Sequence, residues 1–366
     1  MYEDSILKPL VSILIPAYNC ERWVTDTMRS ALAQTWERTE IVVVNDGSKD
    51  GTLRVLEQFA APNVRIVTQP NQGAAAARNR AFAESRGDYV QWLDADDLLA
   101  PDKIAKQMEV LEKCGGKRTL ASAAWGRFLY RYYHADFIPN ALWCDLSPAE
   151  WLIRKMGQDL FMQTACWLIS REITEQAGPW DTKLLGDDDG EYFCRVLLCS
   201  DDIRFVPQAK VYYRASGAGS LSYIGNSDKK MEAQWRSMQL HVGYVRSLED
   251  SPKAREACVA YLENWLIFFY PGRPDLVNQA QELARSLGGE LHLPQLSWKY
   301  SWIESLFGWS RARQSQLRLQ GLRWSAQRIW DRILFRIEGR KFADNFVSPD
   351  AASTAPVRLK TGPIVH

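Results

Sequence analysis

Short apolar runs alternate with amphipathic stretches over the first hundred residues of the chain. The apolar runs, each of which predicts a buried strand, are Val11–Pro16, Glu40–Val44, Val64–Thr68 and Tyr89–Leu93. The stretches between them, which have apolar residues at helical spacing, are 21–36, 52–59 and 74–85. This alternation predicts an α/β fold, with a mostly parallel sheet flanked by helices.

The pattern changes twice further along the chain. After a predicted helix over 101–113, residues 118–224 mix short strands, aromatic loops and one helix over 148–156. From about residue 228 the spacing is helical, for example over 231–248 and 253–269. We therefore predict an α/β domain over 1–225, a helical C-terminal region over 226–344 and a disordered tail over 345–366.

Composition narrows the classes of protein. The net charge of +1 gives no reason to expect a nucleic-acid partner. The seven cysteines are odd in number and have no CxxC spacing, so we expect a reducing compartment rather than disulfides or a zinc site. The acidic N-terminus has no apolar signal core, and no apolar run reaches about 18 residues. These features predict a cytoplasmic location.

Two carboxylates, Asp94 and Asp96, directly follow the fourth predicted strand. Ligands of such sheets bind outside the carboxyl ends of the strands. A D-x-D triplet in that place can share a divalent cation and a ribose hydroxyl, and its hard oxygen ligands suit Mg²⁺ or Mn²⁺. The alternative is that Asp94 and Asp97 cap the turn into the next helix.

The first two strands also end in polar residues. Asp46 closes the second strand before a glycine, where its carboxylate can accept a hydrogen bond from a nucleobase or a ribose. Pro16, Ala17 and Tyr18 close the first strand. Tyr18 can either pack on a flat base or serve as a core aromatic residue.

A third motif opens the helix predicted over 74–85. Gly73 permits close approach of the backbone, and the N-terminus of a helix favours anions such as a diphosphate. Arg78 lies about one and a half turns into this helix, within reach of such a group. The alternative is an ordinary amphipathic helix with an exposed arginine.

An acidic run over 187–191 precedes the segment that ends at Arg195. Crowded carboxylates raise one another's pKa, which suits a general base that works near neutral pH. The alternative is a solvated acidic loop ahead of a helix N-terminus, where the helix dipole favours negative charge.

Together these motifs resemble the inverting family-two glycosyltransferases, which have the GT-A fold. The resemblance is carried by "VSILIPAYN … EIVVVNDGSKDGT … NQGAAAARNRA … WLDADD" within residues 11–97. It continues less strongly to about residue 222, so it covers the first domain. It implies a metal-dependent enzyme that moves a sugar from a nucleotide diphosphate to an acceptor hydroxyl in polysaccharide or glycolipid assembly.

The resemblance also implies roles for single residues. Ala17, Tyr18 and Asp46 would hold the base, usually uracil. Asp94 would contact the ribose, Asp96 would ligate Mn²⁺ or Mg²⁺, and Arg78 would lie near the donor.

The catalytic base of that family belongs to a later acidic pair with an arginine six residues beyond it. Asp189 matches this position, with Arg195 as the arginine. The family more often has Glu-Asp here, so Asp188 and Glu191 compete with Asp189. Arg214, with Ser220 and Ser222 in the following loop, could fold over the diphosphate as a lid.

Two other functions remain open. A nucleotide-sugar-binding protein without transferase activity would lack a base. A nucleotidyltransferase would have a Gly-rich, basic loop after the first strand, where this chain has Pro16-Ala17-Tyr18-Asn19-Cys20. Acceptor residues have no template, although the aromatic side chains could stack on sugar rings or form core: Trp125, Tyr130, Trp143 and Trp167.

The C-terminal segment is basic and aromatic. Residues 297–341 contain ten Lys or Arg, three acidic residues and five Trp. Such a helix can lie on an anionic membrane surface, which predicts a peripheral membrane contact through 295–345. Alternatively, the tryptophans pack on the first domain and the arginines face water.

Overall fold

The computed structural model describes residues 8–215 and 227–338. Its larger sheet has the strand order β3-β2-β1-β4-β7. The first four strands are parallel, and β7 runs antiparallel to β4. Their bounds are β1 Val11–Ala17, β2 Thr39–Asp46, β3 Val64–Gln69, β4 Tyr89–Trp92 and β7 Ile169–Ser170. The predicted mostly parallel sheet is confirmed, and all four predicted strands are present.

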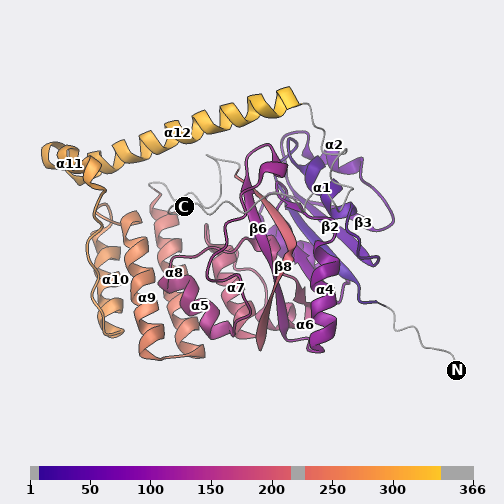
Figure 1. Cartoon of the computed structure of the whole chain (residues 1–366), viewed down its shortest axis with the longest axis horizontal. Helices are drawn as coiled ribbons and strands as arrows, with labels where there is room; N and C mark the ends of the chain where they lie inside the picture. Colours follow the sequence, from indigo (N-terminus) through magenta and orange to yellow (C-terminus); the bar gives the residue numbers. More distant parts are fainter. Residues whose placement is uncertain (1–7, 216–226, 339–366) are drawn as a thin grey trace.

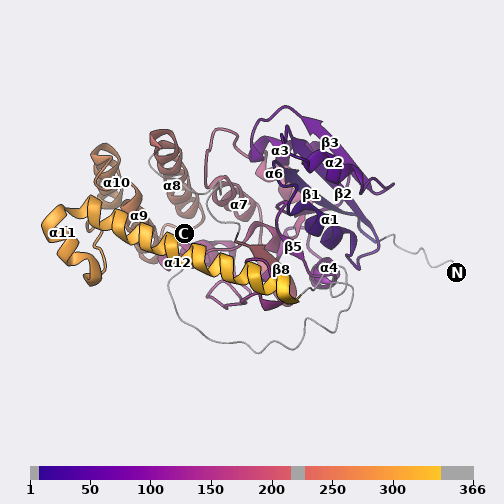
Figure 2. The same ribbon diagram turned by 90° about the horizontal axis from the view of Figure 1, so that it is seen from above.

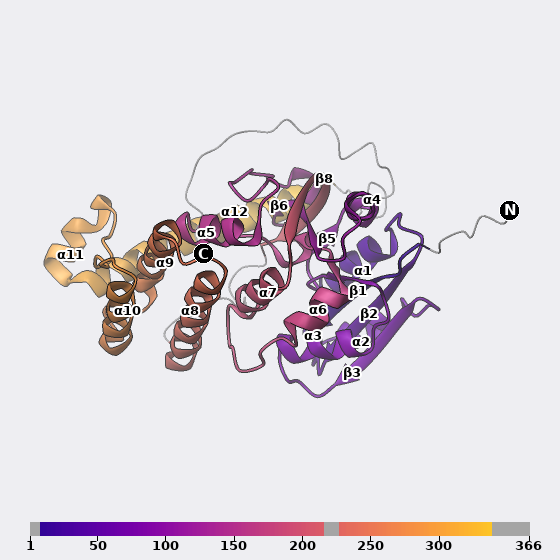
Figure 3. The same cartoon turned by 90° about the horizontal axis from the view of Figure 1, so that it is seen from below.

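Burial explains why these runs form strands. Nearly every residue of β1 and β2 is buried, because helices cover both faces of the sheet. Figures 2 and 3 show α1 and α3 on opposite faces of these central strands. The strand β3 lies at the edge, and its side chains are only partly buried. The helices that connect the strands are α1 Val24–Leu32, α2 Thr52–Glu57 and α3 Ala74–Ala83.

A second sheet continues from the D-x-D segment. It has the order β5-β8-β6, with β5 Leu98–Leu99, β6 Thr119–Phe128 and β8 Asp202–Arg214. The expectation of short strands over 118–224 holds for β7 but is wrong for β6 and β8, which are long and parallel. Residues 207–209 have no partner in β6, because Ala123 pairs with Val206 and Ala124 with Lys210. This bulge at Pro207 interrupts the alternation that a strand pattern needs.

Helices surround the second sheet and form the C-terminal region. In the first domain they are α4 Lys103–Cys114, α5 Pro148–Gly157, α6 Arg171–Ala177 and α7 Asp188–Leu198. In the C-terminal region they are α8 Asp228–Leu248, α9 Pro252–Trp265, α10 Pro274–Ser286, α11 Ser301–Phe307 and α12 Trp309–Glu338. Single 3-10 turns are η1 Tyr132–His134, η2 Thr164–Cys166, η3 Leu266–Phe268 and η4 Trp298–Tyr300.

The C-terminal helices fall into two groups (Figure 1). Helices α8 and α9 pack against α5, α8 also packs against α7, and α10 packs against α9. The long α12 instead runs back along one edge of the molecule toward β6 and β8. The helical C-terminal region is therefore confirmed, whereas the tail predicted over 345–366 lies outside the described residues.

Candidate active site

The register of the parallel strands brings the predicted donor residues to one edge of the sheet. Ala17 pairs with Asn45, and Asp46 pairs with Gln69. On the other side of β1, Leu14 pairs with Trp92. The residues that follow these strands therefore emerge at the same edge, among them Tyr18, Asp46, Asp94 and Asp96.

Asp46 organises the loop that leads into α3. Its buried Oδ1 accepts hydrogen bonds from Gln69 Nε2 at 2.8 Å and from the Gln72 amide at 2.9 Å. Its Oδ2 accepts from the Gly73 amide at 2.8 Å and from Asn71 Nδ2 at 3.2 Å. A nucleobase would have to compete with these four donors, so the carboxylate fixes the loop rather than pointing into open space.

The loops after β1 and β2 are tied together beside Tyr18. The Asn19 amide donates to Ser48 Oγ at 3.0 Å, and the Lys49 amide donates to Asn19 Oδ1 at 2.8 Å. Gly47 adopts φ +67°, and a Cβ there would lie 2.7 Å from the Asn71 nitrogen, so only glycine fits. Tyr18 is 47% exposed, which excludes the core-aromatic alternative.

The D-x-D segment follows β4 and has a third carboxylate beneath it. Asp94 and Asp96 are partly exposed, whereas Asp97 is fully buried. Asp97 accepts from the Arg214 amide at 2.7 Å and from Gln163 Nε2 at 2.5 Å. Burial, with Asp96 and Asp94 nearby, raises the pKa of Asp97 well above its ordinary value. Asp97 therefore holds the loop in place, and the residue that precedes α4 is Asp102.

Arg78 connects the D-x-D segment to the acidic run. Its Nη2 contacts Asp94 Oδ1 at 2.9 Å, and its Nη1 contacts Asp188 Oδ2 at 2.9 Å. The guanidinium also lies over the Trp180 ring, 4.4 Å from the centroid. The alternative of an exposed arginine is wrong, because Arg78 is buried. Its two ion pairs occupy the guanidinium nitrogens that were predicted to reach a diphosphate.

The acidic run forms the first turn of α7, where the helix dipole favours negative charge. Glu191 is buried and accepts from Arg195 Nε at 2.7 Å and from the Tyr244 hydroxyl at 2.8 Å. Asp188 pairs with Arg78. Asp189 is half-buried, and it forms no ion pair within 8–215 and 227–338. The three competing carboxylates thus have distinct surroundings.

Desolvation is the largest influence on the carboxyls of this run. It raises the pKa of Asp189, with further increases from Asp187 and Asp94 and opposition from Arg78. It also raises the pKa of Asp188, against the opposing charge of Arg78. A carboxylate with a raised pKa is a stronger base, which is the property that proton abstraction from a hydroxyl requires.

Asp187 and Gly190 fix the course of the acidic run. Asp187 adopts φ +53°, and its Oδ2 accepts from Gln234 Nε2 at 3.2 Å and lies 3.8 Å from Nδ1 of the buried His241. A Cβ at Gly190 would collide with the Asp187 carboxylate and lie 3.2 Å from His241 Cε1. Helix α8 thereby supports the acidic run from behind. No sequence motif marked His241 for this role.

Arg214, which was expected to fold over the diphosphate as part of a lid, is buried at the end of a strand in this structure. It ends β8 and is buried, with Nε donating to the Asp96 carbonyl at 2.8 Å and Nη2 lying 3.4 Å from Asp26 Oδ2. Its guanidinium lies 4.3 Å from the Trp23 ring centroid. Because β8 pairs with β5, just after the D-x-D segment, Arg214 supports that segment from below. The proposed partners Ser220 and Ser222 lie outside the described residues.

Three half-buried aromatic side chains cluster near the D-x-D carboxylates. The Trp125 and Phe161 centroids are 5.4 Å apart, and Tyr213 lies 6.0 Å from Trp125 and 5.9 Å from Phe161. Burial and the charges of Asp97, Asp96 and Asp94 raise the pKa of Tyr213. Among the other aromatic candidates, Trp167 belongs to the core. Phe161 and Tyr213 were not among the predicted acceptor residues.

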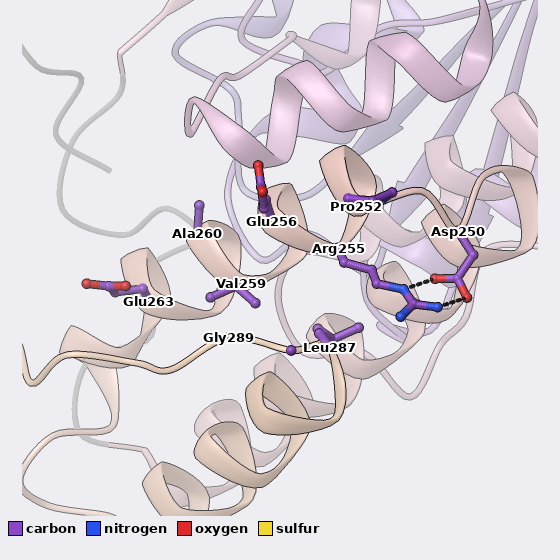
Figure 4. Close-up of a pocket in the computed structure, with 10 residues that line it drawn as sticks. Asp250, Pro252, Arg255, Glu256, Val259, Ala260, Glu263, Leu287 and Gly289 are labelled. Atoms are coloured by element: carbon purple, nitrogen blue, oxygen red, sulfur yellow. Dashed lines mark hydrogen bonds and ion pairs between the residues drawn. The ribbon is translucent and has the colours of Figure 1, made fainter.

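A surface depression lies elsewhere, between α9 and the end of α10 (Figure 4). Its lining includes Val259, Leu287 and the ion pair of Arg255 with Asp250. In this pair Arg255 Nε donates to Asp250 Oδ1 and Nη2 donates to Oδ2, each at 2.9 Å. None of the predicted site residues lines it.

Over the described ranges, no group of three or more His, Cys, Asp and Glu could hold a metal. No helix there is long and apolar enough to cross a membrane.

Comparison with known proteins shows that the N-terminal part of the chain is similar to glycosyltransferases. Residues 12–178 match the glycosyl transferase family 2 model. An uncharacterized glycosyltransferase of Rickettsia prowazekii is 38% identical over 239 residues, which are 64% of this chain and 72% of the relative. A chondroitin synthase of Escherichia coli is 43% identical over 115 residues, covering 30% of this chain and 17% of the relative. The chain spans less than half the length of most curated relatives it matches.

A solved structure has the same fold. The S. aureus TarS fragment 1-349 in complex with UDP-GlcNAc superposes with a TM-score of 0.63 at 14% sequence identity, covering 76% of this chain and 81% of that chain. The GT-A fold implied by the sequence is therefore confirmed. With the Rickettsia prowazekii relative matched over most of its length, the chain belongs to glycosyl transferase family 2.

Proposed function

We propose that the chain is a metal-dependent, inverting glycosyltransferase that moves a sugar from UDP to a hydroxyl of a carbohydrate or glycolipid acceptor. Family membership supports glycosyl transfer. The structural match to a protein solved with UDP-GlcNAc supports UDP as the donor nucleotide. The name of the chondroitin synthase relative supports a role in polysaccharide assembly.

One observation carries the proposal: Arg78 joins Asp94 to Asp188. Through this bridge, the segment that would bind the donor lies beside the segment that would supply the base. A transfer reaction needs both groups in one place, because the acceptor oxygen must approach the anomeric carbon while it loses its proton.

Among the three acidic candidates, Asp189 is the residue we assign as the base. Glu191 is engaged by Arg195 and Tyr244, and Asp188 is engaged by Arg78. An ion pair lowers the basicity of a carboxylate, and Asp189 has no such partner within the described ranges. Its raised pKa adds to its strength as a proton acceptor.

The donor lies at the carboxyl ends of the strands. Pro16, Ala17 and the exposed Tyr18 hold the base, and Asp46 shapes the adjoining loop through its contacts with Gln72 and Gly73. The open space at Gly73, the residue before α3, leaves room for the diphosphate near the helix N-terminus. Asp94 contacts the ribose.

The carboxylates of the D-x-D segment fit a divalent cation. Mg²⁺ is commonly held by one or two carboxylates together with substrate phosphates rather than by a cage of protein ligands. Asp96 would be the protein ligand in this arrangement, with Asp94 restrained by Arg78. When bound, Mg²⁺ or Mn²⁺ would offset the charge that develops on the departing diphosphate.

Asp189 then accepts the proton of the acceptor hydroxyl. The acceptor oxygen forms a bond to the anomeric carbon as the bond from that carbon to the diphosphate oxygen breaks, and UDP leaves. Attack from the face opposite the diphosphate inverts the configuration of the sugar. Arg214 and Asp97 keep the D-x-D segment in position throughout.

Thermal stabilisation by nucleotide sugars tests the donor half of the proposal. UDP-sugars with Mn²⁺ should stabilise the chain by about 2.7 kcal/mol at a concentration of about 100 times the Kd. Chelation should remove most of this effect, as should Asp96→Asn, whereas the control Asp102→Asn should keep it. Stabilisation by no nucleotide sugar would contradict the proposal.

The same screen separates the alternative functions. A nucleotidyltransferase would be stabilised by nucleoside triphosphates and would release pyrophosphate. A binding protein without activity would be stabilised by UDP-sugars and would transfer no sugar to any acceptor.

A further inference from the structure

The two faces of α12 have different surroundings. Its inner face packs on residues 127–133, which end β6 and follow it. Arg131 forms ion pairs with Asp331 at 2.6 Å and Glu338 at 2.8 Å. Arg127 lies 4.7 Å from the Trp324 ring centroid, and Tyr130 lies 6.4 Å from Phe335. These contacts fix the rotation of α12 about its own axis.

The opposite face of α12 is apolar and exposed. We call this set the outer stripe; its members are Leu319, Leu322, Ile329, Trp330, Ile333 and Ile337. They are between 43% and 74% exposed, although their spacing of three, four and seven residues places them on one side of the helix. Figure 1 shows the other described elements on one side of α12 and none on the side away from them.

Arginines flank the outer stripe. Helix α12 contains seven arginines and only two acidic residues, Asp331 and Glu338, both of which are bound to Arg131 on the inner face. The exposed arginines beside the stripe are Arg318, Arg323, Arg332 and Arg336. None of these four forms an ion pair with a residue in 8–215 or 227–338. The outward charge is therefore positive.

We propose that the outer stripe of α12 lies in the headgroup region of an anionic lipid bilayer. An amphipathic helix with an apolar face and basic edges binds such a surface through apolar burial and through attraction to anionic headgroups. The exposed apolar side chains Trp298, Trp302 and Leu306 belong to η4 and α11, which pack against α12. The alternative in which the tryptophans pack on the first domain holds for Trp324, which lies beside Arg127, but not for the exposed Trp298, Trp302 and Trp330.

Charge favours a bilayer over a second copy of the chain. Two outer stripes that met face to face would bring their arginine rows close together, with no acidic side chain of α12 on that face to offset them. Like charges brought into an apolar interface destabilise it. An anionic lipid surface instead complements each arginine.

Vesicle sedimentation of the full chain tests the proposal without donor or cation. The chain should bind vesicles of phosphatidylcholine mixed with phosphatidylglycerol. Its affinity for vesicles of phosphatidylcholine alone should be about tenfold lower. Trp330→Glu with Ile333→Glu should weaken binding to the anionic vesicles by about tenfold or more. The matched control Gln327→Glu adds a charge to an exposed position outside the stripe and should have a smaller effect.

A second variant keeps the test informative if the stripe variant misfolds. Arg332→Glu with Arg336→Glu leaves the stripe intact and should also weaken anionic binding by about tenfold. Absence of binding to anionic vesicles by the folded wild-type chain would overturn the proposal. A wild-type dimer that Trp330→Glu converts to a monomer, as measured by ultracentrifugation, would assign the stripe to a second copy instead.

Discussion

Asp94 and Asp188 are bound by the same guanidinium, that of Arg78, although the first follows a central strand and the second begins a helix much later in the chain. Each contact is 2.9 Å long, and Arg78 itself is buried. Without this cation, two partly buried carboxylates would face each other. The bridge is therefore both a stabilising contact and the link between the two halves of the proposed active site.

Replacing Arg78 with Met should destabilise the chain strongly. Removal of one partner of a buried ion pair leaves uncompensated charge and costs about 3–5 kcal/mol in the free energy of unfolding. Urea denaturation would measure this loss. The matched control is Arg80→Met in the same helix, where an exposed pair with Glu84 is removed and about 1 kcal/mol or less is expected. Equal losses in the two variants would contradict the bridging role.

Asp46→Asn should loosen the loop before α3. The substitution turns one acceptor oxygen into a donor that faces the amide of Gln72 or Gly73. A lost hydrogen bond that leaves buried groups unpaired costs about 1–3 kcal/mol. Hydrogen exchange at these two amides should accelerate, whereas the Thr52 amide, bound by Asp50, should be unaffected. Unchanged protection at Gln72 and Gly73 would contradict the account of Asp46.

Asp189→Asn should raise the melting temperature at neutral pH. Desolvation raises the pKa of Asp189 in the folded state above its unfolded value, so the ionised carboxylate disfavours folding at neutral pH. The gain should shrink as the pH falls through the folded pKa, because the wild-type carboxyl then becomes neutral as well. Thermal melts over a pH series would measure the difference between variant and wild type.

The control for this prediction is Glu191→Gln, which should melt lower than the wild type at neutral pH. It removes the ion pair with Arg195 and weakens the hydrogen bond from Tyr244. If Asp189→Asn were as destabilising as Glu191→Gln, Asp189 would have a structural partner that the present contacts do not include.

The two helical glycines Gly190 and Gly243 should respond to alanine in opposite directions. A Cβ at Gly190 would collide with the Asp187 carboxylate, whereas nothing lies within 4 Å of a Cβ at Gly243. Gly190→Ala should therefore destabilise the chain and displace the acidic run. Gly243→Ala should stabilise α8 by up to about 1 kcal/mol, because alanine loses less backbone entropy. Denaturation midpoints that move in the same direction for both would contradict this view.

The sequence predicted the parallel strands of the first sheet, and the edge at which they end, better than it predicted the elements that pack around that edge. Apolar runs such as Val11–Pro16 need only burial on both faces to become parallel strands, and strand ends follow from their order. The length of β8 was not predicted because the bulge at Pro207 breaks its pattern. The sheet could thus be inferred from periodicity, and the pairing of its second part could not.

The partners of polar side chains were the least predictable part of the site. Arg78 is buried by Trp180 and by two distant carboxylates, which no local pattern contains. The pairing of Glu191 with Arg195 follows the i, i+4 spacing of a helix and could have been read from the sequence. Asp97 adjoins the D-x-D triplet and was considered only as a helix cap, whereas it accepts hydrogen bonds from the distant Gln163 and Arg214. These contacts depend on which elements meet in space, and periodicity does not give that.

The most direct test of the central claim is the rate of sugar transfer by Asp189→Asn. The donor should be the nucleotide sugar that stabilises the chain most, and UDP binding should be measured on the same preparation by calorimetry. We predict nearly unchanged UDP affinity and a transfer rate lower by about a thousandfold, whereas the wild type forms a product of inverted configuration. If the folded Asp189→Asn variant transferred sugar at the same rate as the wild type, the assignment of Asp189 as the base would be contradicted.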